Sequence, residues 1–341
     1  MTITLTEIIN PILVNNVINC NNLPGDNIKD ISNILKRYIK SNGIIKYNQK
    51  QNFGRYMANN GIGLQSFQKD IRKYLANDNY IDVDISNCHP VILEQLFIIH
   101  EITVPKLLEQ YNNDRDSTIK KFNFKDKLDL IKIINTDSCS INQKEIQDLH
   151  YSLFKILLPK LIKIYKVPKD SNNFKTFNLN GSIMAKILQH IENDILICMF
   201  NKCKELNIII GVLVFDGFMI ESKDYTTELL TTLENEVFNK TTFKIKLLQK
   251  SMKTDWKPNI IENDKCNSNK LITKYFTENI GGSLTNIKYL KSSIIGHIND
   301  NDSLKLEHYK HKYSECKGQI LCNFNADKQI ENQINTVITC N

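Results

Sequence analysis

Apolar and polar residues alternate over residues 81–85, which we expect to form a buried strand. The apolar positions are Ile81, Val83 and Ile85. Asp82 and Asp84 lie between them. Side chains in a strand point alternately to opposite faces, so the two carboxylates would share the face away from the apolar side chains. A helical apolar pattern follows over residues 88–101, directly after Asn87, a typical helix-capping residue. The chain is therefore expected to run from a strand, past two acids, into a helix.

A second apolar stretch, residues 208–221, contains two short β-rich runs that meet at Asp216 and Gly217. Asp-Gly is typical of a two-residue hairpin turn, and by itself it indicates no more than a type I′ turn. Because both flanking runs are apolar, we expect the turn to carry an acid at the tip of a buried hairpin. Apolar spacing then predicts a helix over residues 225–238 and a further strand over residues 243–249.

Helical periodicity dominates the long region between these two stretches. It predicts helices near residues 104–111, 124–135, 143–166 and 181–206. Residues 1–45 are expected to form short helices joined by Asn-rich loops. The predicted organisation is an N-terminal helical segment (1–45), a core of two pieces (46–101 and 207–258), a helical insertion (102–206) and a C-terminal accessory region or tail (259–341).

Without the helical insertion, the element order is strand-helix-strand-strand-helix-strand. This is the split βαββαβ arrangement of an α+β fold with an antiparallel sheet. In this arrangement the first strand and the hairpin lie side by side, which would place Asp82 or Asp84 near Asp216. Two carboxylates in contact are electrostatically unfavourable unless cations neutralise them, and oxygen-rich sites suit magnesium. Carboxylates on adjacent strands are also the arrangement that a two-metal phosphoryl-transfer site needs.

The basic residues are compatible with a nucleic-acid partner without deciding it. The net charge of +7 over 341 residues has the expected sign, but a mildly basic protein without such a partner fits equally well. Arg55 lies between aromatic residues, and Arg72 lies on a predicted amphipathic helix. Basic and aromatic side chains together suit phosphate and base contacts. Lys125 and Lys127 belong to a lysine-rich predicted helix, which could bind a triphosphate or simply be solvated.

The cysteines and the N-terminal region indicate a protein inside the cell. The nine cysteines show no Cys-x-x-Cys spacing, and the first residues lack the basic and apolar segments of a signal peptide. No apolar run reaches the length needed to span a membrane. We therefore expect reduced thiols in an intracellular protein that is neither secreted nor membrane-bound. A zinc site is disfavoured because its four candidate ligands are irregularly spaced: His308, His311, Cys316 and Cys322.

Two motifs carry a resemblance to a known group of enzymes. The first is Asp82-x-Asp84-x-x-Asn87-x-His89-Pro90, and the second is Phe215-Asp216-Gly217. Together they resemble the palm motifs of family A DNA polymerases and, more closely, the transposon–virus polymerase group found in virophages and mobile elements. Further matches between Tyr47 and Lys250 are Gly54-Arg55, Leu64-Gln65 with Arg72, Tyr111 with Arg115, and Lys127 with Asn135.

The resemblance implies a polymerase palm formed by residues 46–101 and 207–258, with residues 102–206 as a fingers insertion. It also implies that Asp84 and Asp216 are catalytic and bind two Mg²⁺ or Mn²⁺ ions, assisted by Asp82. The implied nucleotide-binding residues are Lys127, Lys125, Arg115, His89 and Asn87. The implied nucleic-acid-binding residues are Arg55, Arg72 and Lys250.

By this resemblance the protein would be a template-directed DNA polymerase of a virus or mobile element. It would act on a DNA primer–template with nucleoside triphosphates. Primase activity is left open, and a superfamily-3 helicase is a candidate partner in trans. Family A enzymes usually carry a glutamate after the first motif's serine and an acidic pair in the hairpin, where this chain has Asn87, His89 and Gly217. The choice between ribonucleotides and deoxyribonucleotides therefore stays open.

Two other functions remain compatible with the sequence. Paired aspartates with magnesium also cut phosphodiesters in nucleases, although a nuclease needs no lysine-bearing insertion to bind a triphosphate. The chain could also be a non-catalytic nucleic-acid-binding module, although it retains both Asp84 and Asp216. His89 is either a ligand or proton donor, or a structural histidine of the first helical turn. Glu192 lies near the apolar side of its predicted helix, and we expect it to be a surface residue.

Overall fold

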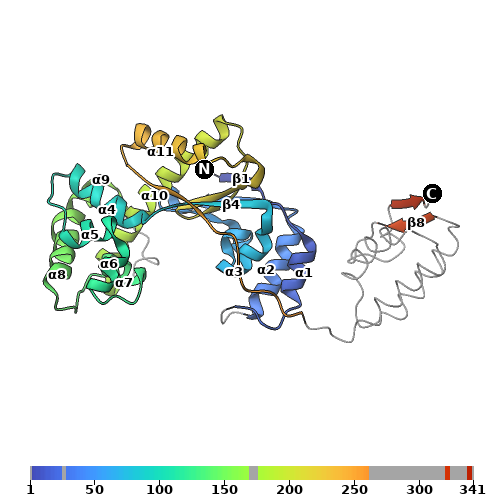
Figure 1. Ribbon diagram of the computed structural model, residues 1–341, viewed down its shortest axis with the longest axis horizontal. Coiled ribbons are helices and arrows are strands. Elements are labelled where there is room, and N and C mark those ends of the chain that lie inside the picture. Colours follow the sequence, from blue (N-terminus) through green and yellow to red (C-terminus); the bar gives the residue numbers. More distant parts are fainter. Residues whose placement is uncertain (1, 25–27, 169–175, 261–318, 323–335, 340–341) are drawn as a thin grey trace. The chain divides into compact units, whose positions relative to one another are not determined.

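The computed structural model describes residues 2–24, 28–168, 176–260, 319–322 and 336–339. The chain divides into two compact units, one of residues 1–18 and 23–257 and the other of residues 19–22 and 258–341. The larger unit contains two antiparallel sheets and many helices (Figure 1). The predicted combination of helices with an antiparallel sheet is therefore confirmed.

Four strands form the larger sheet. They are β4 (Tyr80–Ile85), β5 (Ile210–Val214), β6 (Gly217–Glu221) and β7 (Leu247–Lys250). Their order across the sheet is β5-β6-β4-β7, and each neighbouring pair is antiparallel. β4 thus lies between the hairpin of β5 and β6 and the last strand, β7. The sequence predicted the hairpin as the neighbour of the strand with the two acids.

The alternating stretch forms β4 as predicted, but both of its faces are buried. Val83 and Ile85 are almost fully buried among apolar side chains, and Asp82 and Asp84 are only 8% and 7% exposed. The polar face therefore also lies inside the protein. Ionised carboxylates in such a place need compensating charges, because burial removes the water that would otherwise stabilise them.

The last strand is shorter than the strand predicted over residues 243–249. β7 begins only at Leu247, although Ile245 is buried as well. The backbone of Lys244 is bonded by Gln95 instead: its N–H donates to Gln95 Oε1 at 2.6 Å, and its carbonyl accepts from Gln95 Nε2 at 2.9 Å. The alternating pattern therefore indicated burial, but a side chain satisfies the backbone groups that a neighbouring strand would have paired.

A second sheet, which the sequence did not predict, forms near the N-terminus. It contains β1 (Thr2–Thr6), β2 (Ile44–Gln49) and β3 (Tyr56–Ala58), paired antiparallel in the order β1-β2-β3. The expectation of helices over residues 1–45 is met by α1 (Pro11–Ile18) and α2 (Ile28–Lys40) and is wrong for β1 and the start of β2. Thr-Ile-Thr-Leu-Thr alternates as a strand should, but five residues give a weak signal.

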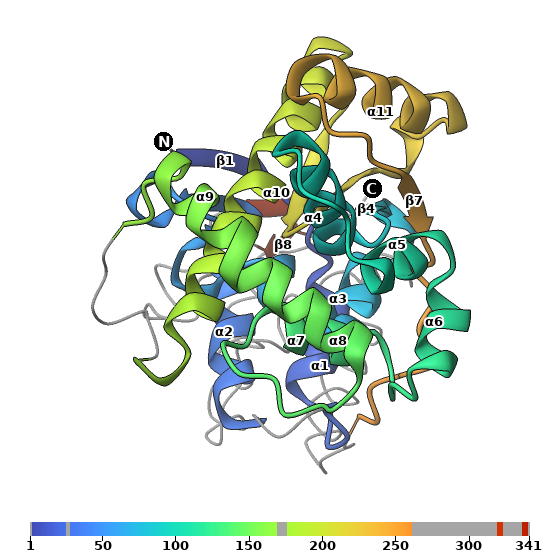
Figure 2. The same cartoon turned by 90° about the vertical axis from the view of Figure 1, so that its left-hand side faces the viewer.

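Helices fill the region between β4 and β5. They are α4 (Cys88–Ile99), α5 (Lys106–Asn113), α6 (Arg115–Lys121), α7 (Lys127–Ile134), α8 (Lys144–Tyr151), α9 (Leu158–Ile164) and α10 (Leu179–Glu205). A π-helical turn, Ser152–Leu157, joins α8 to α9, and the two run as one rod in Figure 2. The helices predicted for this region are confirmed, and α6 is an addition.

Two further helices are adjacent in the sequence to strands of the larger sheet. α3 (Lys69–Ala76) precedes β4, and α11 (Thr227–Thr241) lies between β6 and β7, close to the predicted helix over residues 225–238. Figure 1 shows α1–α3 on one side of β4 and α11 on the other, with α5–α9 gathered at one end. The division into a palm-like core and a fingers-like insertion stays a prediction.

Local features mark the two ends of α10. At the N-terminus of α10, Asp137 accepts hydrogen bonds from the backbone N–H groups of Asn180 and Gly181, which a first helical turn leaves unpaired. At its C-terminus the chain turns at Asn207, whose φ is +58°.

The buried side of α10 consists mainly of apolar residues at three- and four-residue spacing, and Glu192 lies among them.

The smaller unit is described only at a few places. β8 (Gln319–Cys322) pairs with β9 (Thr336–Thr339) in an antiparallel arrangement. The zinc hypothesis for His308, His311, Cys316 and Cys322 lies outside the residues whose side chains are described.

A helix that crosses a membrane must be both long and predominantly apolar. Within the ranges that the structure describes, none of the helices is both long enough and apolar enough to cross a bilayer.

A buried glutamate joins β1, β2 and the loop before α3. Glu7 is 2% exposed, and its carboxylate accepts hydrogen bonds from Tyr47 Oη and from the Leu64 N–H, both at 2.9 Å. Burial raises the pKa of Glu7 to about 7, although the hydrogen bonds from Leu64, Tyr38 and Tyr47 oppose this rise. Glu7 is therefore protonated in the folded protein at pH values where it is ionised in the unfolded chain.

This difference makes the stability of the protein depend on pH. Between about pH 4.5 and 7 the folded chain holds a proton on Glu7 that the unfolded chain has lost, so the free energy of unfolding falls as the pH rises, by roughly 3 kcal/mol in all. Glu7→Gln should remove this part of the pH dependence. Urea unfolding from pH 4 to 8 measures it, with the exposed Glu109→Gln as control. An unchanged pH profile in Glu7→Gln would contradict the prediction.

Candidate active site

The pairing of β4 with β6 brings the two predicted catalytic acids together. Asp84 is opposite Gly217 in the ladder, and the Ile85 N–H donates to the carbonyl of Asp216 at 3.3 Å. The two carboxyl groups lie close enough for the charge of Asp84 to help raise the pKa of Asp216. Two residues that are distant in the sequence, the buried Asp84 and the half-buried Asp216, thus form a pair that we call the acid pair.

The hairpin turn differs by one residue from the predicted one. Val214 pairs with Gly217, so the two turn residues are Phe215 and Asp216, and Gly217 is already the first residue of β6. Phe215 adopts a positive φ of +52°. Gly217 is required for another reason: a Cβ atom there would lie 2.2 Å from the Val83 carbonyl oxygen on β4. The glycine permits the close approach of the strands that carry the acids.

The charge of Asp84 disfavours the ionised forms of Asp216 and Asp82. Burial, followed by the charges of Asp84 and Glu192, raises the pKa of Asp216 to about 7, while Lys250 opposes the shift. Burial and the charge of Asp84 likewise raise the pKa of Asp82, and Lys250, Arg72 and Lys73 oppose that shift. A divalent cation would reverse both effects, because it stabilises the ionised carboxylates.

Two predicted nucleic-acid-binding residues lie at the acid pair itself. Lys250 is opposite Asp82 in the ladder between β4 and β7, and its ammonium group forms an ion pair with Asp84 Oδ2. Arg72 of α3 is half-buried beside the same acids. Burial lowers its pKa, and the charges of Asp82, Asp84 and Asp216 oppose that change. Both residues therefore neutralise the acids in this state of the protein.

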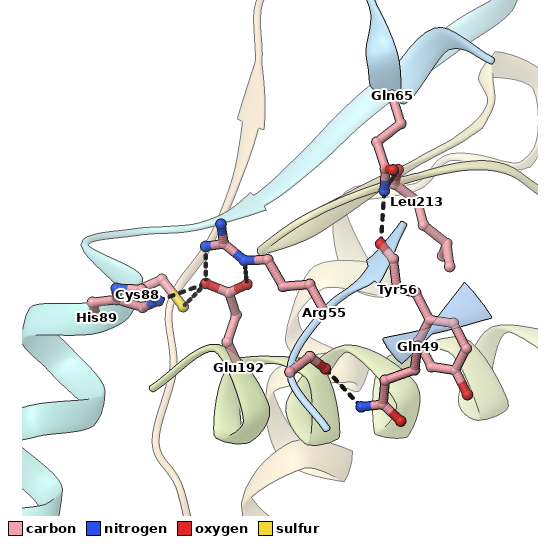
Figure 3. A network of polar contacts seen from close by, with 9 residues as sticks. Gln49, Arg55, Tyr56, Gln65, Cys88, His89, Glu192 and Leu213 are labelled. Carbon is pink, nitrogen blue, oxygen red and sulfur yellow. Dashed lines mark hydrogen bonds and ion pairs between the residues drawn. The ribbon is translucent and has the colours of Figure 1, made fainter. Parts of the chain in front are cut away.

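Arg55, the third predicted nucleic-acid-binding residue, is held by Glu192. Arg55 Nε lies 2.5 Å from Glu192 Oε1, and Arg55 Nη2 lies 2.7 Å from Glu192 Oε2, so the guanidinium and the carboxylate bind through two parallel bonds (Figure 3). The other side of Arg55 covers the ring of Phe215, with 5.0 Å between the guanidinium carbon and the ring centroid. Its contact with a nucleic acid stays a prediction.

Glu192 also contacts the start of α4. His89 Nε2 lies 2.9 Å from Glu192 Oε2, and the Cys88 thiol donates to the same oxygen at 3.9 Å (Figure 3). Glu192 is fully buried, so the expectation of a surface residue was wrong. A charged residue within an otherwise apolar helical face was the signal in the sequence. It could not name Arg55 or His89 as partners, because these belong to other segments.

Asn87 and Arg115, two predicted nucleotide-binding residues, contact each other. Arg115 Nη1 donates to Asn87 Oδ1 at 3.2 Å. Asn87 precedes α4 in the left-handed conformation, with φ +47° and ψ +41°, and its side chain makes no capping hydrogen bond. The expected cap is therefore replaced by a contact between the start of α4 and α6. Nucleotide binding by both residues stays a prediction.

Lys125 and Lys127 lie in and next to the first turn of α7. Both side chains are exposed, and the Lys125 backbone N–H donates to Asp129. In the part of the chain that the structure describes, neither ammonium group forms an ion pair with the acid pair. The structure thus leaves open which of the two would reach a triphosphate.

The acid pair is compatible with magnesium, although it is no closed metal site. In the described ranges, no cluster of three or more His, Cys, Asp and Glu side chains is arranged to hold a metal ion. Mg²⁺ is commonly bound by one or two carboxylates together with substrate phosphates and water, and not by protein ligands alone. Asp84 and Asp216 supply the two carboxylates, and Asp82 lies on the same face of β4.

Comparisons with known proteins add little to this geometry. No protein-family model matches the chain, and no curated protein matches it. Among solved structures, it is similar to the POL domain of Pol1 from M. smegmatis in complex with DNA primer-template and dNTP, with 13% sequence identity and a TM-score of 0.42. The match covers 65% of this chain and 49% of that chain, so this chain spans about half the length of the matched one. A likeness this distant carries no argument.

The close approach of β6 to β4 can be tested at Gly217. Gly217→Ala places a methyl group against the Val83 carbonyl and should lower the free energy of unfolding by roughly 1–3 kcal/mol, because the strands must separate. Gly61→Ala is the control, since its methyl group meets nothing within 4 Å and costs only the strain of a positive φ. Urea unfolding compares the two variants. A smaller loss in Gly217→Ala than in Gly61→Ala would contradict the interpretation.

Proposed function

We propose that this protein is a template-directed DNA polymerase that extends a primer by phosphoryl transfer with two Mg²⁺ or Mn²⁺ ions. The observation that carries the proposal is the acid pair, which brings Asp84 of β4 next to Asp216 of the turn that leads into the neighbouring antiparallel strand β6. Two carboxylates placed close together and largely shielded from water are an unfavourable arrangement unless cations bind there. The resemblance of the two acid-bearing motifs to polymerase palm motifs supports the same assignment, with β4 to β7 as a palm.

Asp84 and Asp216 would hold the cations, and Asp82 would assist from the same face of β4. Bound cations would supply Lewis-acid stabilisation of the transferring phosphoryl group and of the attacking primer hydroxyl. Such a reaction needs little covalent chemistry from protein groups, because positioning and charge neutralisation do most of the catalysis. The buried strand β4 and the tight turn before β6 suit this role, since they fix the backbone that carries the carboxylates.

Lys250 and Arg72 would exchange partners when the substrate binds. In the protein alone they neutralise the acids. Once cations bind the carboxylates, both basic groups are free to contact the phosphates of the triphosphate or of the primer–template. The Arg115–Asn87 pair at the start of α4 is a further place for a nucleotide contact, and Lys127 and Lys125 would approach the triphosphate from α7. A helicase in trans and primase activity belong to the same proposal.

Primer extension tests the acid pair directly. Asp84→Asn and Asp216→Asn should each lower incorporation at least ~100-fold, because a lost metal ligand removes several kcal/mol of transition-state stabilisation. Binding of the primer–template should change little, since it depends on basic residues. A labelled primer–template with Mg²⁺ or Mn²⁺ and each nucleotide set measures incorporation, with the exposed Asp148→Asn as control. Unchanged incorporation in both variants would refute the proposal, and shortening of the primer would indicate a nuclease.

The two lysines can be compared with each other. If Lys127 contacts the triphosphate, Lys127→Ala should raise the KM for the incoming nucleotide about tenfold, the usual effect of losing one charge-assisted hydrogen bond. Lys125→Ala, two residues away and equally exposed, should then leave KM within about twofold. Steady-state incorporation with varied nucleotide concentration gives both values. The opposite order would assign the contact to Lys125, and no change in either would exclude both.

A further inference from the structure

Glu192 is a buried charge that the proposed chemistry does not use. Its carboxylate is 0% exposed, yet it carries three contacts from two other segments: Arg55 before β3, and His89 and Cys88 at the start of α4. Buried ion pairs add little stability compared with apolar residues of similar volume, so such a cluster calls for a role other than stability.

The cluster of Glu192 with Arg55, His89 and Cys88 is connected to Asp216 through Arg55. Arg55 lies over the ring of Phe215, the turn residue directly before Asp216, and Phe215 adopts a positive φ. A bulky residue in that conformation is strained, and it persists only when its surroundings hold it in place. The planar guanidinium, fixed by Glu192 on one edge, supplies such a support for the turn.

The backbone around Arg55 is itself anchored to the hairpin. Gln49 Nε2 donates to the Gly54 carbonyl at 2.6 Å, on one side of Arg55. On the other side, Gln65 Nε2 donates both to the Tyr56 carbonyl at 3.0 Å and to the Leu213 carbonyl of β5 at 2.9 Å (Figure 3). Arg55 therefore approaches Phe215 from a backbone that is bonded to the strand leading into the turn.

The same cluster is connected to the segment after Asp84 through Cys88 and His89. Cys88 and His89 begin α4, the helix that follows the β4 strand ending just after Asp84. Glu192 contacts both residues, so one carboxylate on α10 is joined to the segment after Asp84 and, through Arg55, to the turn with Asp216. Although burial raises the pKa of Glu192, contacts with His89 and Arg55 bring it below its usual value, so the carboxylate stays ionised and keeps its ion pair with Arg55.

We propose that Glu192 and Arg55 are positioning residues of the acid pair: through Phe215 and the start of α4 they hold Asp216 and Asp84 at the separation at which the pair binds divalent cations. Neither side chain touches the cations. This inference rests on the proposed function, because it requires that the acid pair is a cation site. It differs from a nucleic-acid-binding role of Arg55, since the guanidinium is already engaged by Glu192.

The test is binding of Mn²⁺ to the full chain without nucleotide or DNA, measured from the electron paramagnetic resonance signal of the free ion. Glu192→Gln removes the charge, and Arg55→Lys keeps the charge but loses the planar fork. Both variants should bind Mn²⁺ about 10–100-fold more weakly, the usual effect of losing a group that orients a metal ligand. Glu205→Gln, which breaks a surface ion pair with Lys202 on the same helix, is the matched control and should bind as the unaltered protein does.

Hydrogen exchange gives a second readout that a change in overall stability would not imitate. The segment 210–221 should exchange faster in Arg55→Lys and Glu192→Gln, whereas α11 should exchange at the unaltered rate. If either variant fails to fold, the double variant Arg55→Met with Glu192→Met replaces the ion pair by apolar side chains and leaves no buried charge without its partner. When folded, it should show the same weak Mn²⁺ binding and the same faster exchange.

The outcomes separate this inference from the proposed function. If Asp216→Asn loses Mn²⁺ binding while Arg55→Lys and Glu192→Gln keep it within about twofold, the positioning role is refuted and the cation site stands. If Asp216→Asn binds Mn²⁺ as well as the unaltered protein, the cation site itself is wrong and the positioning role falls with it. If Arg55→Lys alone behaves as the unaltered protein, the cluster only balances charge, which also overturns the inference.

Discussion

The close approach of Asp84 and Asp216 is the constraint around which the larger unit is organised. Burial and the charge of Asp84 both disfavour the ionised form of Asp216, which is why its pKa rises to about 7. The pair exists only because β6 is paired with β4 in one register, and a slip of one residue would turn every side chain of the strand to the opposite face. Gly217 secures that register by allowing the backbones to approach closely.

Compensating charges surround the acids at two distances. Lys250 forms an ion pair with Asp84, and Arg72 of α3 is near enough to interact electrostatically with Asp82, Asp84 and Asp216. Arg55 is further away, bound to Glu192 and stacked on Phe215. Lys250 is exposed, whereas the ion pair of Arg55 with Glu192 has a fully buried carboxylate. This division suits a site that must be stable when empty and rigid when occupied.

The helical region between β4 and β5 contributes to the site mainly through α10. This helix returns the chain to the sheet, and its buried side carries Glu192 among apolar residues. The surface lysines of α7 and the Arg115–Asn87 contact also belong to the region between β4 and β5, whereas Arg55, the partner of Glu192, comes from the segment before β3. A reaction catalysed by positioning and charge neutralisation needs both kinds of group.

Local patterns in the sequence by themselves determined the strand with Asp82 and Asp84, the apolar hairpin and the helices between them, because periodicities of two and 3.6 residues are written in consecutive residues. They missed β1, misplaced the hairpin turn by one residue and extended the last strand over Lys244, where Gln95 bonds the backbone. Only the tertiary structure decided that the acid face is buried, that Lys250 and Arg72 neutralise it, and that Glu192 holds Arg55 and His89. Each of these depends on segments distant in the sequence, whose approach is set by strand register and packing and leaves no local pattern.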